Sequence, residues 1–140
     1  MRINIIYDSK YGNCKNISEY LENSLENNNV KKFFVKDTDP DYIRSADLYI
    51  FSTPTQMGKA TKRMRKFVKN LQIDGQSVKY GLITTYSKEK TDSLKELEGM
   101  LKKKGFKKAA NNLRFKVQGK KGNLERGYEK DLDKFLEKLT

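Results

Sequence analysis

Two short segments of small, polar residues follow apolar runs, and the first has residue types that could bind a phosphate. The first is Ser9–Cys14, and the second is Thr53–Gly58. A buried strand that turns through a glycine-containing loop into a helix leaves several backbone N–H groups unpaired and pointing one way. Such groups bind anions. The first segment therefore indicates a site for the phosphate of a nucleotide-like ligand.

The elements that must position these segments alternate between strand-like and helix-like runs along the chain. Continuous apolar runs predict five strands, over residues 2–7, 30–35, 47–52, 78–84 and 113–117. Apolar residues at spacings of three and four predict helices over 13–26, 60–71 and 128–139, with another that Thr91 or Asp92 caps and Gly105 ends. Pro40 favours a short helical turn that ends near Ser45.

Strands that alternate with helices form a parallel sheet, because parallel neighbours need crossover connections. We therefore expect an α/β fold in one domain, residues 1–140, with a five-stranded parallel sheet of order 2-1-3-4-5 and helices on both faces. Ligands bind such sheets where the strand order reverses, here between the first and third strands. The segments Ser9–Cys14 and Thr53–Gly58 follow those two strands. Topology and composition thus indicate the same crevice.

The composition excludes several kinds of site. The chain has no histidine and one cysteine, Cys14, which rules out an internal disulfide and argues against zinc sites and histidine-dependent triads. We assign no metal site and no catalytic acid or base. No run approaches the roughly 20 apolar residues of a membrane span, and nothing resembles a signal peptide. We therefore expect a cytoplasmic protein with no membrane span.

The net charge of +12 is unevenly distributed. Residues 1–58 have 7 basic and 8 acidic side chains, whereas residues 59–140 have 23 and 10, a net +13. This asymmetry favours an acidic partner. The predicted helix after the second polar segment has six cations and no acid, and we expect it to dock that partner: Lys59, Lys62, Arg63, Arg65, Lys66 and Lys69. A merely solvated face is the alternative, and it is also the interpretation of a second cluster, Lys102, Lys103, Lys104, Lys107 and Lys108.

Four motifs, in the expected order, make the chain similar to the flavodoxin family. They are SKYGNC (9–14), STPTQMG (52–58), TTYS (84–87) and the tail 119–139, and the resemblance covers essentially the whole chain. It implies a flavodoxin-like three-layer sandwich that binds FMN and carries electrons between redox proteins. The length matches the short-chain members of the family.

By this resemblance, three segments would surround FMN. The phosphate loop would consist of Ser9, Lys10, Tyr11, Gly12, Asn13 and Cys14. The ribityl chain and one side of the flavin would contact Thr53, Pro54, Thr55, Gln56, Met57 and Gly58. The other side would contact Thr85, Tyr86 and Ser87, with Tyr86 stacked on the ring. Two alternatives stay open: Tyr86 packs over the sheet edge, and Met57 fills a gap in the core.

Two features depart from the family. Cys14 stands where many flavodoxins have a second threonine, and a thiol is a weaker donor than a hydroxyl, so we expect an inert thiol and a lower phosphate affinity. Flavodoxins are usually acidic, whereas this chain is basic, so its redox partner should have an acidic docking surface. Two alternatives are an FMN-dependent reductase of quinones or similar acceptors, and a flavin-free basic binding module. No nucleic-acid motif is recognised, and nucleic acid is not the expected partner.

Overall fold

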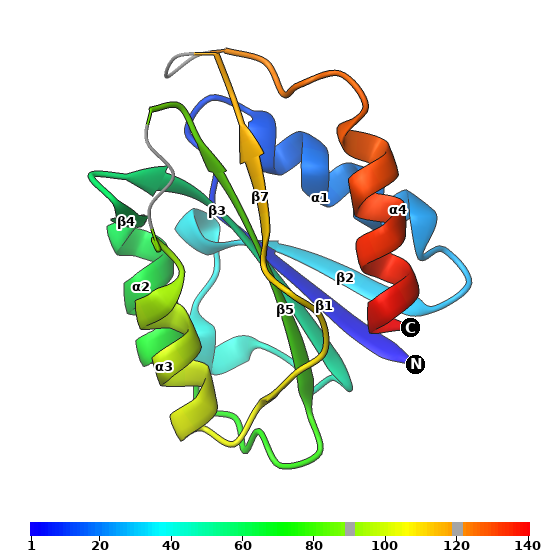
Figure 1. Cartoon of the computed structure of the whole chain (residues 1–140). Coiled ribbons are helices and arrows are strands. Elements are labelled where there is room, and N and C mark those ends of the chain that lie inside the picture. Colours follow the sequence, from blue (N-terminus) through cyan, green and yellow to red (C-terminus); the bar gives the residue numbers. More distant parts are fainter. Residues whose placement is uncertain (89–91, 119–121) are drawn as a thin grey trace.

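A twisted, mostly parallel sheet forms the centre of the computed structural model (Figure 1), which describes residues 1–88, 92–118 and 122–140. Four long strands run parallel in the order β2-β1-β3-β5: β1 (Arg2–Tyr7), β2 (Asn29–Phe34), β3 (Leu48–Gln56) and β5 (Lys79–Tyr86). Beyond β5, two short strands share the last position, β6 (Lys107–Lys108) and β7 (Leu113–Lys116). The predicted order 2-1-3-4-5 is confirmed, with its fifth strand split in two.

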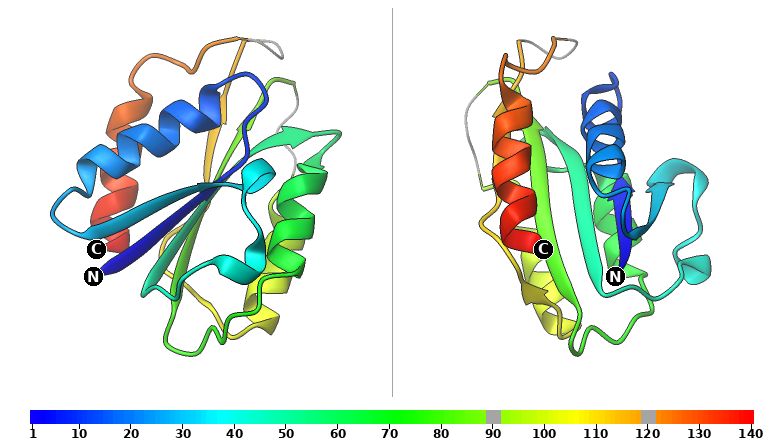
Figure 2. Two further views of the ribbon diagram at one scale, coloured as in Figure 1. Left: turned by 180° about the vertical axis from the view of Figure 1, so that it is seen from behind. Right: turned by 90° about the vertical axis from the view of Figure 1, so that its right-hand side faces the viewer.

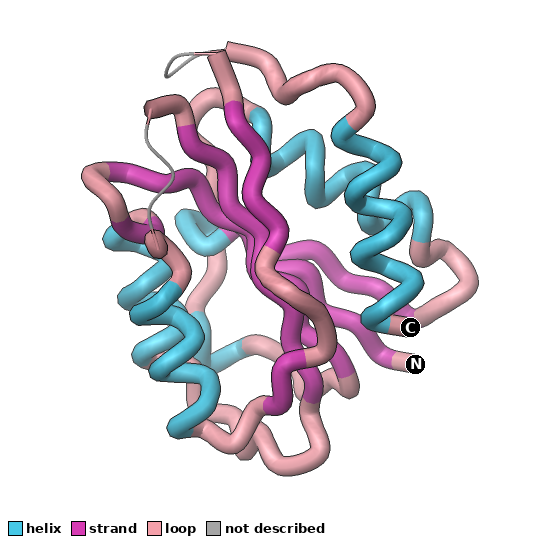
Figure 3. The backbone as a smooth tube through the Cα atoms, in the orientation of Figure 1, coloured by secondary structure: helices cyan, strands magenta, loops and turns pink. Residues whose placement is uncertain are grey.

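Helices cover both faces of this sheet (Figures 1 and 2). One face is covered by α1 (Asn13–Ser24) and α4 (Tyr128–Leu139), and the other by α2 (Lys62–Lys69) and α3 (Lys95–Lys103). The tube in Figure 3 shows the three layers, with the strands between the helices. In the described part of the chain, no helix has the length and apolarity needed to cross a lipid bilayer.

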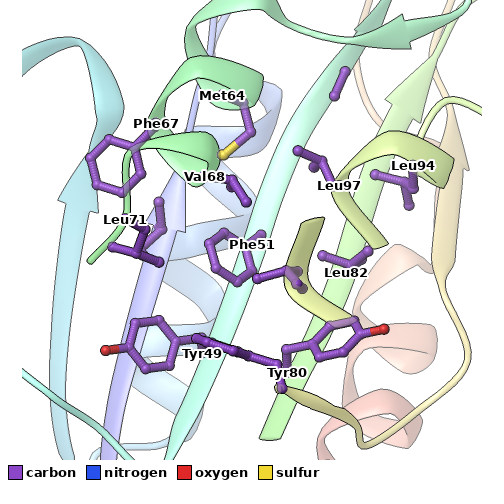
Figure 4. Close-up of a cluster of buried hydrophobic side chains, with 14 of the residues drawn as sticks. Tyr49, Phe51, Met64, Phe67, Val68, Leu71, Tyr80, Leu82, Leu94 and Leu97 are labelled. Carbon is purple, nitrogen blue, oxygen red and sulfur yellow. The ribbon is translucent and has the colours of Figure 1, made fainter. Parts of the chain in front are cut away.

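Alternate residues of each strand contribute to two apolar cores, because successive side chains point to opposite faces. In β3, Leu48 and Ile50 belong to the core under α1 and α4. Tyr49 and Phe51 belong to the core under α2 and α3, which Figure 4 shows. On the first of these faces α4 packs directly on Gly81, where a Cβ atom would lie 2.7 Å from a ring atom of Phe135.

The second polar segment is an ordered hairpin, although the sequence predicts an irregular loop. Strand β3 continues to Gln56, and β4 (Lys59–Ala60) pairs with its end in the antiparallel direction. The two turn residues, Met57 and Gly58, have φ values of 52° and 78°. Positive φ at both central positions is typical of a type I′ turn, whose twist matches that of the flanking strands.

Two other predictions differ from the structure. The helical turn between 37 and 45 is two separate 3-10 turns, η1 (Val35–Asp37) and η2 (Pro40–Tyr42). Helix α3 begins after Leu94, without a side-chain cap, and Asp92 forms an ion pair with Arg114 at 3.4 Å, so the prediction of an Asp92 cap is wrong. The other candidate, Thr91, lies outside the described residues, as do residues 119–121 of the tail motif.

Candidate functional site

A cavity of about 680 Å³ lies at the carboxyl ends of β1, β3 and β5. Its walls come from the loop after β1, the β3–β4 hairpin and the segment after β5, so the three predicted segments meet at one place. The volume lies within the roughly 300–1,000 Å³ typical of ligand sites. The lining residues are Ser9, Lys10, Tyr11, Asn13, Cys14, Pro54, Thr55, Gln56, Met57, Gly58, Thr85, Tyr86, Ser87, Lys88 and Val117.

Thirteen of the fifteen predicted cofactor-binding residues line this cavity, and Gly12 and Thr53 do not. Gly12 forms the turn before α1. Thr53 is fully buried, and its hydroxyl accepts the Thr61 N–H at 3.4 Å, which connects β3 to the start of α2. The cavity also includes Lys88 and Val117, which no polar motif indicates. Val117 directly follows β7, and an apolar residue at a strand end gives no binding signal in a sequence.

The loop after β1 presents an uncapped helix start to the cavity. The Gly12 N–H donates to Ser9 Oγ at 3.1 Å, and Gly12 has a φ of 98°. Helix α1 begins at Asn13 with no side-chain cap and no acidic residue in its first turn. The first N–H groups of such a helix have no intrahelical acceptor and lie at the positive end of its dipole. The donor set therefore fits a phosphate group.

Asn13 does not cap this helix. Its Nδ2 instead donates to the Gly122 carbonyl at 2.6 Å. This bond joins the loop after β1 to a segment more than one hundred residues further along the chain. It fixes one edge of the loop after β1 to the C-terminal part of the fold.

The buried carboxylate of Asp8 supports the loop after β1 through a hydrogen bond to its backbone. Asp8 is fully buried, and its oxygens accept the Ser9 N–H at 2.9 Å and the Thr61 hydroxyl. Arg63 donates to it through Nη2 at 2.8 Å and through Nε at 3.3 Å. The four donors compensate the desolvation of this charge, which would otherwise be costly. Asp8 thus joins the loop after β1 to the N-terminus of α2.

Cys14 is an inert thiol. The side chain is buried, and its Sγ lies 3.8 Å from Thr85 Oγ1. Burial raises the pKa of the Cys14 thiol to about 12. Desolvation thus outweighs the helix dipole, which would lower the pKa.

Hydroxyl groups hold the hairpin against β5. Thr84 Oγ1 donates to the Thr53 carbonyl at 2.7 Å and lies 2.8 Å from Thr55 Oγ1. Since a hydroxyl has one proton, Thr55 must donate to Thr84 and accept from Ser93, whose Oγ is 2.9 Å away. Thr55 therefore has no proton left for a ligand. Its side chain supports the cavity wall, and its hydroxyl oxygen can only accept a hydrogen bond from a ligand.

The other two walls present larger side chains. Met57 is completely exposed at the hairpin tip, with a relative accessibility of 102%, so the alternative that it fills a gap in the core is wrong. Tyr86, the last residue of β5, is half-buried and lines the cavity. Both side chains are placed where they can contact a ligand.

Two of the six cations on the predicted docking face interact with other residues, so fewer of them are free to bind a partner than the sequence suggests. Arg63 pairs with Asp8, and the Arg65 guanidinium donates to the Ala60 carbonyl at 3.1 Å and lies 3.6 Å from Glu96. Both arginines therefore connect α2 to other elements. The remaining four cations of the predicted docking face are exposed: Lys59, Lys62, Lys66 and Lys69.

Comparisons with known structures find the same fold in proteins of low sequence identity. A short-chain flavodoxin associated with a non-canonical PDU bacterial microcompartment has a TM-score of 0.83 and 19% identity, over 99% of this chain and 96% of that one. Flavodoxin 1 from Bacillus cereus has a TM-score of 0.82 and 12% identity, over 99% and 97%.

A larger protein contains the fold as one part. The rubredoxin oxygen:oxidoreductase of the anaerobe Desulfovibrio gigas has a TM-score of 0.82 and 18% identity over 99% of this chain. This chain spans only 35% of the length of that protein.

Sequence comparison assigns the family. No curated protein matches this chain significantly. The family model for flavodoxin, however, matches residues 5–135, which includes all three cavity segments. FMN is the cofactor of that family. The chain belongs to the flavodoxin family.

Proposed function

We propose that this protein binds FMN non-covalently in the 680 Å³ cavity and carries single electrons between redox proteins. The observation that supports this most directly is the convergence of three polar segments on one cavity, in a chain of the flavodoxin family. FMN supplies the redox chemistry when bound, and the protein supplies binding, orientation and electrostatics.

Each wall of the cavity then has a separate role. The first-turn N–H groups of α1 and the Ser9–Gly12 loop hold the phosphate, with its charge at the positive end of the helix. Tyr86 and the Met57 tip flank the flat ring, since both side chains lie at the cavity with apolar surface to offer. The buried hydroxyls of Thr55, Thr84 and Ser93 keep the hairpin in place and do not donate to the ligand.

The redox partner that fits this protein has an acidic docking surface. β4 leads directly into α2, so Lys59 and Lys62 follow the hairpin tip closely in the chain, and Lys66 and Lys69 lie further along the helix. Opposite charges steer association and orient two proteins before electron transfer. Lys59, Lys62, Lys66 and Lys69 supply that charge, whereas Arg63 and Arg65 contribute less, since they are paired with Asp8 and Glu96.

Titration with FMN tests the cofactor site directly. We expect stoichiometric uptake, seen as quenching of flavin fluorescence, and weaker binding after Tyr86→Ala. The matched control is Tyr42→Ala, because Tyr42 is 84% exposed in η2 and does not line the cavity. Absence of FMN uptake, or equal loss of affinity in the two variants, would contradict the proposed site.

Electron exchange with two probe proteins tests the role as a carrier. Transfer of electrons from the reduced, FMN-loaded protein to an acidic redox protein should slow when salt is added, whereas transfer to a basic cytochrome should not slow. Steady turnover of a nicotinamide donor with a quinone, without a second protein, would instead identify a reductase. The same salt dependence with the two probes would rule out an acidic docking partner.

A further inference from the structure

A second cavity, of about 440 Å³, adjoins the first. The two share a wall formed by Ser9, Lys10 and Gln56. The rest of the second lining comes from the residue after β1, the end of β2, η1 and the start of α2: Asp8, Phe34, Lys36, Thr61, Lys62 and Arg63. Neither the sequence motifs nor the FMN site account for this cavity.

The second cavity has a surplus of positive charge. Among the described residues that line it, Asp8 is the only acidic one, and Arg63 already pairs with it. The other three cations, Lys10, Lys36 and Lys62, are exposed, and none takes part in an ion pair among residues 1–88, 92–118 and 122–140. They come from three separate elements that converge here, so their mutual repulsion is a feature of the folded protein. A bound anion would relieve it.

Two other parts of the cavity wall are held by contacts within the protein. Thr61 caps α2 by accepting the Met64 N–H at 3.2 Å, and the Asp8 carboxylate lies at the same helix end. The free positive charge of the cavity therefore comes from the lysines. The apolar part of the wall is held in place. The Phe34 ring stacks on Tyr7 at 5.1 Å and 7°, and the Arg63 guanidinium lies 5.7 Å from its centroid.

We propose that the second cavity binds an oligophosphate, an anion with at least two linked phosphate groups, beside the FMN site. Three lysine ammonium groups match several phosphate oxygens, and the volume is much larger than one phosphate group needs. Ser9 and Lys10 also belong to the loop that holds the FMN phosphate, whereas Lys36 and Lys62 line only this cavity and therefore distinguish the two sites. The proposed oligophosphate site does not require that the protein carries electrons.

Calorimetric titration of the FMN-saturated protein with inorganic pyrophosphate tests this site. We expect one pyrophosphate per chain, and binding weakened roughly tenfold or more in the double variant Lys36→Gln/Lys62→Gln. The matched control is Lys66→Gln/Lys69→Gln, which removes the same charge from exposed positions of α2 outside the cavity and should change the affinity less than twofold. Melting temperatures would establish that both variants are folded.

Three outcomes would overturn the proposal: no pyrophosphate binding, binding that disappears when FMN saturates the protein, and equal weakening in the two double variants. The last would mean diffuse attraction to a basic surface. Flavin content, measured by absorbance, reports a failure of the FMN site separately. A parallel titration with ADP identifies the source of the phosphates, since tighter binding than pyrophosphate supports a nucleotide and equal binding supports an inorganic oligophosphate.

Discussion

The two adjoining cavities use different chemistry although they share a wall. Fifteen of the described residues line the larger cavity, and of these only Lys10 and Lys88 are charged. Of the nine that line the smaller one, five are ionisable. The lining of the larger cavity consists mostly of neutral polar groups and aromatic rings, whereas charged side chains make up most of the lining of the smaller one. The comparison shows how one set of strand ends can hold two anionic ligands without one uniformly basic cleft.

Asp8 supports both cavities, and its substitution should have the largest effect. Asp8→Asn removes the negative charge that pairs with Arg63. It also puts an amide N–H₂ group where the Ser9 N–H, the Thr61 hydroxyl and Arg63 all need an acceptor. We expect a loss of about 2–4 kcal/mol in the free energy of unfolding, measured by urea denaturation. The control is Asp92→Asn, since Asp92 also pairs with an arginine but is 62% exposed and should cost less than about 0.5 kcal/mol. Equal losses would mean that the Asp8 network contributes little.

Substitution of Gly12 should affect ligand binding only in the larger cavity. Its φ of 98° disfavours any side chain, although a Cβ atom there would meet no atom within 4 Å, so the cost is purely conformational. Gly12→Ala should destabilise the protein by about 1–2 kcal/mol and weaken FMN binding, while pyrophosphate binding is retained.

The control for this variant is Gly99→Ala. Gly99 lies inside α3 with equally open space around it, and alanine there should stabilise the helix by up to about 1 kcal/mol. Loss of pyrophosphate affinity in Gly12→Ala would show that the two cavities are coupled through their shared wall.

The neutral character of the larger cavity also depends on Cys14 staying protonated. Because burial raises the pKa of this thiol to about 12, the unfolded state loses its proton first as the pH rises. The stabilising contribution is complete below the unfolded pKa of about 8.5 and is lost between about pH 8.5 and 12. Relative to Cys14→Ser, the wild type should lose roughly 1–2 kcal/mol of unfolding free energy between pH 8 and 10. A constant difference would mean that the thiol ionises equally in both states.

Long-range electrostatics between the cavities should give the smallest effect. Lysines of the second cavity favour the anionic reduced flavin, so Lys36→Gln/Lys62→Gln should lower its midpoint potential by on the order of 10–40 mV at low salt. The control is Lys102→Gln/Lys103→Gln at the C-terminal end of α3, away from both cavities, which should change the potential less. A higher potential in the first variant would contradict this sign.

The sequence predicts the strand order and the larger cavity well, because both follow from local patterns. Apolar runs define the strands, and parallel topology places the segments after the first and third strands together. The hairpin is less predictable, since its turn residues Met57 and Gly58 are not the Asn-Gly or Asp-Gly pair that signals a type I′ turn. The split of the fifth strand has no sequence signal that we recognise.

The second cavity and its support could not be predicted, because they depend on contacts between distant residues. Asp8 and Arg63 are 55 positions apart, and only the packing of α2 beside β1 brings them together. From the sequence, all six cations near α2 look equally free. The structure divides them into two arginines that join elements and four exposed lysines.

The split of the fifth strand affects association between folded molecules through the edges of their sheets. On that border of the sheet, β6 has only two residues, Lys107 and Lys108, and on the opposite border β2 includes Lys31 and Lys32. Open backbone groups at a border can otherwise recruit a strand from another molecule and start aggregation. Short length at one border and positive charge at both oppose that pairing, so concentrated solutions should stay free of fibrils.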